Sequence, residues 1–187
     1  MRYLRQFFYD RFGTKRGAFN KAIIYFLYKT GRFNKFSSID KANISRLVFI
    51  CKGNVCRSPF AEEIAKKNGV NVISFGLETD GNTPANKDVV RVAKKIGIDL
   101  SSHCSAKFDS DKIKSGDLII GMEPKHCLEI SKYKYPNNVQ ISLLGTLAKK
   151  GKTAYIHDPY GLSDGYIYNC LILIKRCVEG ICNDLKK

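Results

Sequence analysis

The sequence lacks a long hydrophobic run. The longest uncharged apolar stretch near its N-terminus, residues 22–28, has seven residues, whereas a helix that crosses a membrane needs about 20. No N-terminal segment combines a basic start with an apolar core in the manner of a secretory signal. We therefore expect a cytoplasmic chain without a membrane-spanning helix.

Histidine is scarce, and the cysteines follow no metal-binding or disulfide pattern. The three His and seven Cys show neither Cys-x2-Cys nor His-x3-His spacing, so a zinc site is not expected. The odd number of scattered cysteines argues against a disulfide framework and for a reducing compartment. We expect neither a metal nor a cofactor.

Acidic residues are few, and the basic excess is uneven. The chain has 17 Asp and Glu against 32 Lys and Arg, and residues 1–46 hold 11 of the basic residues but only 2 of the acidic ones. Such basicity favours phosphoproteins, anionic lipid or nucleic acid as partners. No nucleic-acid motif or aromatic platform accompanies the charge, so nucleic acid is the least favoured of the three.

The composition changes near residue 45. Residues 1–45 hold 11 of the 21 Tyr and Phe and form a basic, aromatic-rich extension with helices predicted over residues 2–12 and 19–29. Breaks are expected at three glycines, Gly13, Gly17 and Gly31. Residues 46–187 are predicted to form a separate domain.

From residue 46 onward, short apolar segments alternate with segments of helical spacing. Strands are predicted over residues 47–51, 71–75, 117–122 and 139–143. Helices are predicted over residues 59–68, 86–96, 124–131 and 165–185. This alternation is typical of an α/β fold, and it predicts a single domain with a four-stranded parallel sheet flanked by helices on both faces. Ligands are expected at the carboxyl ends of the strands.

A glycine-containing loop between a cysteine and an arginine directly follows the first predicted strand. Its sequence is Cys51-Lys52-Gly53-Asn54-Val55-Cys56-Arg57-Ser58, and it continues through a proline into a predicted helix. Glycine and asparagine tolerate positive φ, so backbone amides can turn inward around an anion. The N-terminus of the helix adds a partial positive charge. The loop is therefore predicted to bind phosphate.

The same surroundings favour the ionised, nucleophilic form of the Cys51 thiol. Arg57 can hold two phosphoryl oxygens in bidentate geometry, and Ser58 is predicted to hydrogen-bond the sulfur. Cys170 and Arg176 have the same spacing, but the segment between them lacks glycine and has helical periodicity. We interpret that second pair as core packing.

Residues 48–59 resemble the signature of the low-molecular-weight protein tyrosine phosphatases, most closely of the bacterial type. The likeness extends to Asp158-Pro159-Tyr160 and covers about residues 46–185. It implies hydrolysis of phosphotyrosine through a phosphocysteine intermediate, with Asp158 as the general acid. It also implies a catalytic set of Cys51, Arg57 and Asp158 and a substrate-binding set of Lys52, Gly53, Asn54, Val55, Cys56, Ser58, Leu77 and Tyr160.

The sequence is compatible with two functions other than phosphotyrosine hydrolysis. Thioredoxin-coupled arsenate reductases share the loop, but they need two further cysteines after the third strand. Glu123 stands where the first of these would fall, and only Cys127 is nearby. A catalytically inactive phosphotyrosine-binding module is the second alternative, but it would not need both Cys51 and Asp158.

The resemblance to bacterial members implies a phosphotyrosine protein as partner, such as a bacterial tyrosine kinase of exopolysaccharide or capsule synthesis. The sequence is compatible with two roles for residues 1–45. Interleaved basic and aromatic residues in short helices suit attachment to an anionic membrane surface, at the inner face of the membrane. Alternatively the aromatic residues pack on the catalytic domain, because many exposed rings reduce solubility.

Overall fold

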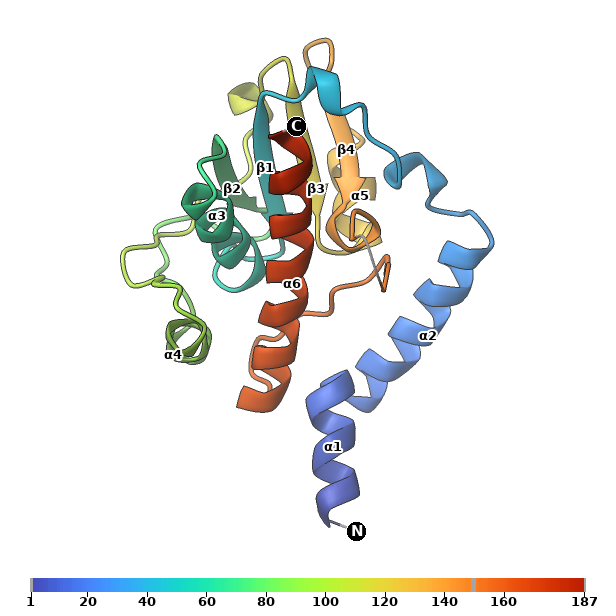
Figure 1. Ribbon diagram of the computed structural model, residues 1–187, viewed down its shortest axis with the longest axis vertical. Helices are drawn as coiled ribbons and strands as arrows, with labels where there is room; N and C mark the ends of the chain where they lie inside the picture. Colours follow the sequence, from blue (N-terminus) through green and yellow to red (C-terminus); the bar gives the residue numbers. More distant parts are fainter. Residues whose placement is uncertain (1, 149–150, 187) are drawn as a thin grey trace.

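The computed structural model describes residues 2–148 and 151–186. Its centre is a four-stranded sheet in the order β2-β1-β3-β4, in which every neighbouring pair is parallel (Figure 1). The strands are β1 (Arg46–Cys51), β2 (Val72–Gly76), β3 (Asp117–Gly121) and β4 (Gln140–Leu143). The sequence predicted each of these strands to within one residue at either end.

The helices alternate with the strands from β1 onward, and two more precede the sheet. They are α1 (Arg2–Phe12), α2 (Lys15–Lys29), α3 (Arg57–Lys67), α4 (Lys87–Lys95), α5 (Pro124–Ile130) and α6 (Asp164–Leu185). Short 3-10 turns occupy Asn34–Phe36, Lys41–Asn43, Ser110–Lys112 and Leu144–Thr146. None of the helices in the described residues is long and apolar enough to cross a membrane.

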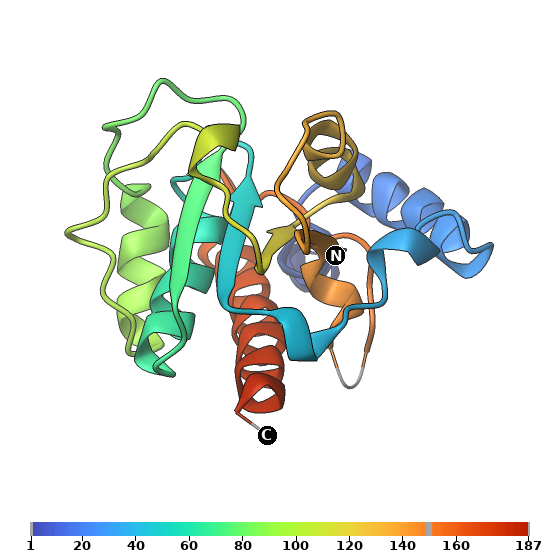
Figure 2. The same cartoon turned by 90° about the horizontal axis from the view of Figure 1, so that it is seen from above.

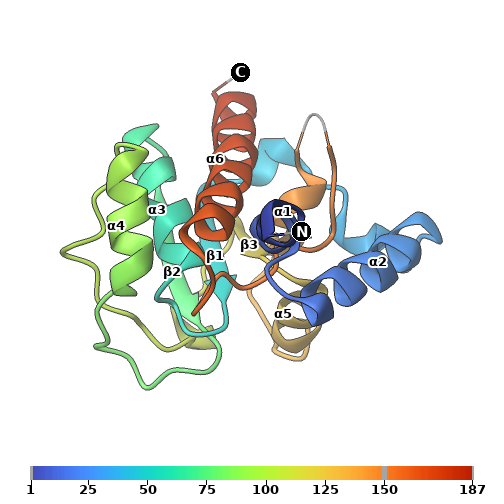
Figure 3. The ribbon, with the colours of Figure 1, turned by 90° about the horizontal axis from the view of Figure 1, so that it is seen from below.

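Helices cover both faces of the sheet, as predicted. Alternate residues of β1 point to opposite faces, so Leu47 and Phe49 pack in the main core with α3, α4 and α6. Val48 and Ile50 pack on the other face with Ile130 of α5. Figure 3 shows α6 and α5 on opposite sides of the strands. The predicted α/β fold is confirmed.

The N-terminal helices lie outside these layers. Figures 1 and 2 show α2 on the side of the molecule opposite α4, and α1 packs against α6. After α2, Phe33 and Phe36 are buried in a small cluster with Cys127, Leu143 and Ala154. The extension is therefore attached to the sheet domain at two separate places.

The expected break at Gly17 is wrong, because α2 runs unbroken over Lys15–Lys29. Thr14 starts this helix by accepting a hydrogen bond from the Gly17 amide at 2.8 Å. Gly17 is buried, and a Cβ atom there would lie 2.9 Å from Nε2 of His157. The break at Gly13 is confirmed by its φ of 75°. Glycine at position 17 thus permits close packing instead of ending a helix.

Candidate active site

The glycine-containing loop connects β1 to α3 at the carboxyl edge of the sheet. Cys51 is the last residue of β1, Arg57 is the first residue of α3, and both side chains are buried. A cavity of about 240 Å³ opens at this loop. Its lining consists of Cys51, Lys52, Gly53, Val55, Cys56, Glu78, Asp158 and Tyr160.

The carbonyl groups of the loop are bound to the surrounding structure, whereas several amides are free. The carbonyls of Cys51 and Lys52 accept hydrogen bonds of 3.1 and 2.7 Å from the two residues that follow β2. The amides of Gly53, Val55 and Cys56 have no acceptor among residues 2–148 and 151–186. Unpaired amides favour binding of water or a ligand, so this part of the loop offers a set of donors to an anion.

Asn54 holds the loop in place through its hydrogen bonds. It is fully buried and has a φ of 53°. Its Nδ2 donates to the hydroxyls of Ser58 at 2.8 Å and Ser74 at 2.7 Å, and its Oδ1 accepts from the Ala106 amide at 2.8 Å. Its own amide donates to the sulfur of Cys51 at 3.3 Å. These bonds set the shape of the loop before a ligand arrives.

Replacing Asn54 should destabilise the protein. Asn54→Gly keeps the positive φ accessible but removes three buried hydrogen bonds, and we expect a loss of about 2–4 kcal/mol in the free energy of unfolding. Asn54→Ala should lose about 1–2 kcal/mol more, because alanine is strained in the left-handed region. Urea unfolding followed by circular dichroism measures both losses.

Asn138 provides the matched control. It also has a positive φ, of 64°, but its side chain is exposed. Asn138→Gly should therefore change stability little, and Asn138→Ala should show the conformational strain alone. If Asn54→Gly destabilises the chain no more than Asn138→Gly, the buried hydrogen bonds of Asn54 do not hold the loop.

The two thiols of the loop have different surroundings. The Cys51 sulfur lies 3.0 Å from the Ser58 hydroxyl, so the contact predicted for Ser58 is present in the structure. Burial, together with the charges of Asp158 and Cys51, raises the pKa of Cys56 far above its ordinary range. Cys56 therefore remains a neutral thiol at physiological pH and does not compete as a nucleophile.

The Arg57 guanidinium is buried between two carboxylates. Its Nη1 pairs with Glu123 and donates to the Ile156 carbonyl at 2.9 Å, while its Nη2 lies 2.8 Å from Oδ2 of Asp158. Burial opposes the charged form, but the charges of Asp158, Glu123 and Cys51 outweigh it and raise the pKa of Arg57 above its usual value. Arg57 is thus a fixed positive charge next to the loop.

Two nitrogens of Arg57 remain available as donors. Its Nε and Nη2 are buried and have no hydrogen-bond acceptor within the described parts of the chain, because the contact of Nη2 with Asp158 is an ion pair without hydrogen-bond geometry. Adjacent guanidinium nitrogens of this kind can bind two oxygens of one phosphoryl group. The glutamate on the other side holds the guanidinium in place.

Asp158 lies at the wall of the cavity. Its carboxylate is 30% exposed, and its Oδ1 accepts a hydrogen bond of 3.3 Å from the Tyr160 amide. The segment before it is tied to the end of β3 by a 3.0 Å hydrogen bond from the Ile156 amide to the Met122 carbonyl. A partly exposed carboxylate facing a buried thiol suits proton transfer at a reacting atom between them.

The structure brings most of the predicted site residues together. Asn54 and Ser58 do not line the cavity but lie behind the sulfur. Leu77 does not line it either and packs against the hydrophobic cluster on the α5 face of the sheet. Its neighbour Glu78 lines the cavity instead. No pattern in the sequence indicates this role for Glu78, because period-two alternation is lost in the irregular segment after β2.

The thiol-relay chemistry of arsenate reductases has no support at Cys127. This side chain is buried, and its thiol donates to the Ser142 carbonyl at 3.3 Å. Burial raises the pKa of Cys127 to about 12. Thiol–disulfide exchange needs an accessible thiolate, so Cys127 is unsuited to it. The described residues also contain no group of three or more His, Cys, Asp or Glu side chains placed to hold a metal ion.

Comparisons with known proteins agree with this geometry. The chain is 29% identical over 138 residues to the probable low molecular weight protein-tyrosine-phosphatase EpsP of Ralstonia nicotianae, covering 73% of this chain and 92% of that protein. It is 42% identical over 81 residues to an arsenate reductase of Brevibacillus brevis, but this match spans 42% of the chain and only 58% of the reductase.

A solved structure and a family model extend the match over the whole sheet domain. The tyrosine phosphatase Wzb from Escherichia coli K30, solved with sulphate, superposes with a TM-score of 0.68 at 27% identity, covering 76% of this chain and 99% of Wzb. The family model described as low molecular weight phosphotyrosine protein phosphatase matches residues 46–187. The chain therefore belongs to this family and is a phosphatase.

Proposed function

We propose that this enzyme hydrolyses phosphotyrosine in proteins through a phosphocysteine intermediate on Cys51. The observation that carries the proposal is the cavity of about 240 Å³ in which the Cys51 thiol meets unpaired loop amides beside the buried Arg57. The Cys51 thiolate attacks phosphorus, and the bond from phosphorus to the tyrosyl oxygen breaks. The loop amides and Arg57 hold the non-bridging oxygens in the transition state.

Asp158 completes both steps of the reaction. The electron pair of the broken bond stays on the tyrosyl oxygen, which takes a proton from Asp158 as it leaves. The resulting carboxylate then takes a proton from water, whose oxygen attacks the phosphocysteine and releases inorganic phosphate and the thiolate. The Ser58 hydroxyl, 3.0 Å from the sulfur, stabilises that thiolate by a hydrogen bond.

The cavity wall suits an aromatic leaving group. Val55 and Tyr160 line the cavity, and Tyr160 is 64% exposed, so its ring is free to pack against that of a phosphotyrosine. Lys52 and Glu78 form an ion pair of 3.3 Å at the rim, where residues flanking the phosphotyrosine would pass. A phosphoserine has no ring to pack against this wall.

A substrate panel tests the proposal. The full chain is offered peptides that carry phosphotyrosine, phosphoserine or phosphoarginine, and separately arsenate with thioredoxin, thioredoxin reductase and NADPH. We expect phosphate release from phosphotyrosine with a kcat/KM at least about 10²-fold above the other peptides, the order that an enzyme pocket commonly achieves. Arsenate-dependent NADPH oxidation would support a reductase, and phosphotyrosine binding without turnover would support an inactive binding module.

We propose that the enzyme acts in the cytoplasm on a bacterial tyrosine kinase of exopolysaccharide or capsule synthesis. The resemblance of the loop and of Asp158-Pro159-Tyr160 to the bacterial members supports this choice. In a strain that lacks the enzyme, the kinase should carry more phosphotyrosine and the polymer yield should change. Unchanged kinase phosphorylation would contradict the proposal.

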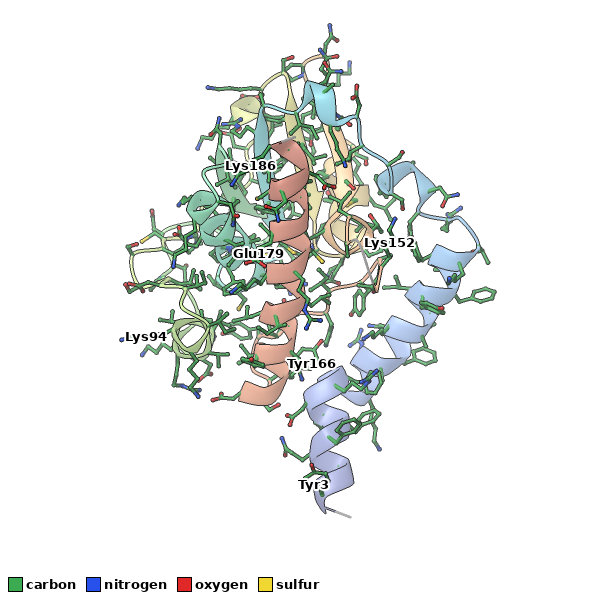
Figure 4. The ribbon with its side chains drawn as sticks, viewed as in Figure 1. Tyr3, Lys94, Lys152, Tyr166, Glu179 and Lys186 are labelled. Carbon is green, nitrogen blue, oxygen red and sulfur yellow. The ribbon has the colours of Figure 1, made fainter. Side chains whose placement is uncertain are left out.

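We also propose that residues 1–45 form an accessory unit that attaches the enzyme to an anionic membrane surface. Phe19 and Phe26 of α2 are 65% and 66% exposed, and Ile23 between them shares their face of the helix. Figure 4 shows side chains of α1 and α2 directed away from the sheet domain, with Tyr3 near the free end. Aromatic rings and basic residues on one short helix suit the headgroup region.

Vesicle sedimentation of the full chain checks this attachment. We expect binding to vesicles that contain anionic lipid, weaker binding at high salt, and a clear loss in the double variant Phe19→Ser, Phe26→Ser. Leu128→Ser is the control, because Leu128 is an exposed apolar residue of α5. Equal binding by wild type and the double variant would contradict membrane attachment through α2.

A further inference from the structure

The corner between α1 and α2 packs directly on the segment that carries the proposed acid. Gly13 and Gly17 both face His157, which immediately precedes Asp158. A Cβ atom on Gly17 would lie 2.9 Å from the His157 Nε2, and one on Gly13 would lie 3.3 Å from the His157 Cδ2 and 2.6 Å from the Leu162 Cδ1. The absence of side chains at these two positions is therefore what allows the extension to touch the loop.

Polar side chains lead from α2 to the same histidine. Asn20 and Tyr155 lie next to each other at one cavity with His157, and the Tyr155 hydroxyl lies 2.8 Å from Nδ1 of His157. Tyr166 packs on the other side of the imidazole, with the ring centroids 6.0 Å apart. Burial lowers the pKa of His157, so the imidazole is neutral at physiological pH. The side chain next to Asp158 is thus fixed by α2 and α6 together.

The far end of the loop is held in the same way. The Asp10 carboxylate accepts a hydrogen bond of 2.8 Å from the Ser163 hydroxyl, and the Asp10 carbonyl accepts one of 2.9 Å from the Asn169 side chain. A Cβ atom on Gly165 would lie 2.5 Å from the Asp10 carboxylate, so that carboxylate sits tightly on the first turn of α6. Figure 3 shows α1 beside this end of α6, and Figure 4 marks Tyr166 near the α1–α2 corner.

We infer that Gly17 and Asn20 of the N-terminal extension are positioning residues of the phosphatase reaction, which act through His157 on Asp158. The inference rests on the proposed function and extends it to residues outside the family match, which begins at residue 46. Between Asp158 and the start of α6 the chain has no regular structure, so contacts from the extension limit its movement. A displacement of about 1 Å at an acid or base can lower a rate about 10²-fold.

Point variants of the full chain test this role. Gly17→Ala places a methyl group 2.5 Å from the Phe12 carbonyl oxygen and 2.9 Å from the His157 Nε2, although alanine is the better helix former by about 1 kcal/mol. Asn20→Ala removes the polar side chain next to Tyr155 without adding bulk. Gly180→Ala is the matched control, because the same substitution in α6 meets nothing within 4 Å.

The readout is the dependence of kcat/KM on the leaving group, because kcat/KM reports only the steps up to formation of the phosphocysteine. Phenyl phosphate needs a proton on its leaving oxygen, whereas 2,4-dinitrophenyl phosphate does not. We expect Gly17→Ala and Asn20→Ala to lower kcat/KM for phenyl phosphate about 10-fold or more and to leave kcat/KM for the dinitrophenyl ester within about 2-fold, with Gly180→Ala unchanged on both. The retained dinitrophenyl activity also shows that each variant is folded.

Equal losses on the two esters, or no loss on phenyl phosphate in either variant, would overturn the positioning role and leave the proposed function intact. A wild-type chain that hydrolyses neither ester would overturn both. These outcomes separate a structural effect of the extension from a specific effect on proton transfer.

Discussion

Cys51→Ser should abolish turnover of a phosphotyrosine peptide, with a loss of at least about 10⁴-fold, the order seen when a covalent nucleophile is removed. A serine hydroxyl is a far weaker nucleophile than a thiolate, because it stays protonated near neutral pH. The anion site should survive, since the amides of Gly53, Val55 and Cys56 do not depend on the sulfur. Phosphate release and calorimetric binding of inorganic phosphate measure the two properties.

The control for this variant is Cys104→Ser, because Cys104 is an exposed cysteine that does not line the cavity. It should keep wild-type turnover. Turnover by Cys51→Ser within about 10²-fold of wild type would contradict a covalent mechanism, since that loss is small enough to come from a displaced loop alone.

Asp158→Asn should slow hydrolysis of a phosphotyrosine peptide by about 10²–10⁴-fold, the usual contribution of a positioned acid. Asparagine keeps the shape of the side chain but has no proton to transfer to the tyrosyl oxygen. With 2,4-dinitrophenyl phosphate, whose leaving group is stable as an anion, the rate of the first step should therefore stay close to that of the wild type. A pre-steady-state burst of dinitrophenol isolates that step from hydrolysis of the phosphocysteine.

Two other carboxylates serve as comparisons for Asp158. Glu123 is buried and paired with Arg57. Glu123→Gln should therefore lower the rate of hydrolysis of both substrates by the same factor, because it releases the guanidinium. Asp164 is paired with Arg91 and does not line the cavity, so Asp164→Asn should keep activity. Equal losses in the rate of the first step on the two substrates in Asp158→Asn, or a leaving-group dependence in Asp164→Asn, would assign the acid elsewhere.

The fold and the loop were predictable because their signals are local. Each strand is a short apolar segment, and Gly53 and Asn54 mark the turn between β1 and α3 by their tolerance of unusual backbone angles. The structure uses Asn54 in this way, with a φ of 53°. Helix α3 begins at Arg57, two residues before the predicted start, because its first turn accepts proline at its third position.

Contacts between distant segments were not predictable from the same signals. The pairing of Arg57 with Glu123 joins residues 66 positions apart and depends on β3 lying beside β1, which alternation alone does not fix. The hydrogen bonds from Asn54 to Ser74 and Ala106 depend on how the loops after β2 fold back. The side-chain pattern of these segments contains no period that reports such contacts.

The N-terminal extension contains both buried and exposed aromatic residues. Phe33 and Phe36 pack on the sheet domain, while Phe19 and Phe26 remain exposed. The aromatic pattern could not separate these two pairs, because burial depends on the surface that each helix meets. The contact of Gly17 with His157 was not predicted for the same reason. From sequence alone, a glycine at this position indicates a break in a helix.

Detection of the phosphocysteine tests the covalent mechanism without an intervening assumption. Wild-type enzyme is mixed with ³²P-labelled phosphotyrosine peptide, quenched within milliseconds, and digested for mass spectrometry under conditions that preserve phosphothioesters. We expect transient label on the peptide that contains Cys51, with greater accumulation in Asp158→Asn when a dinitrophenyl ester is the donor. Phosphate release without any labelled enzyme, or label on a residue other than Cys51, would contradict this expectation.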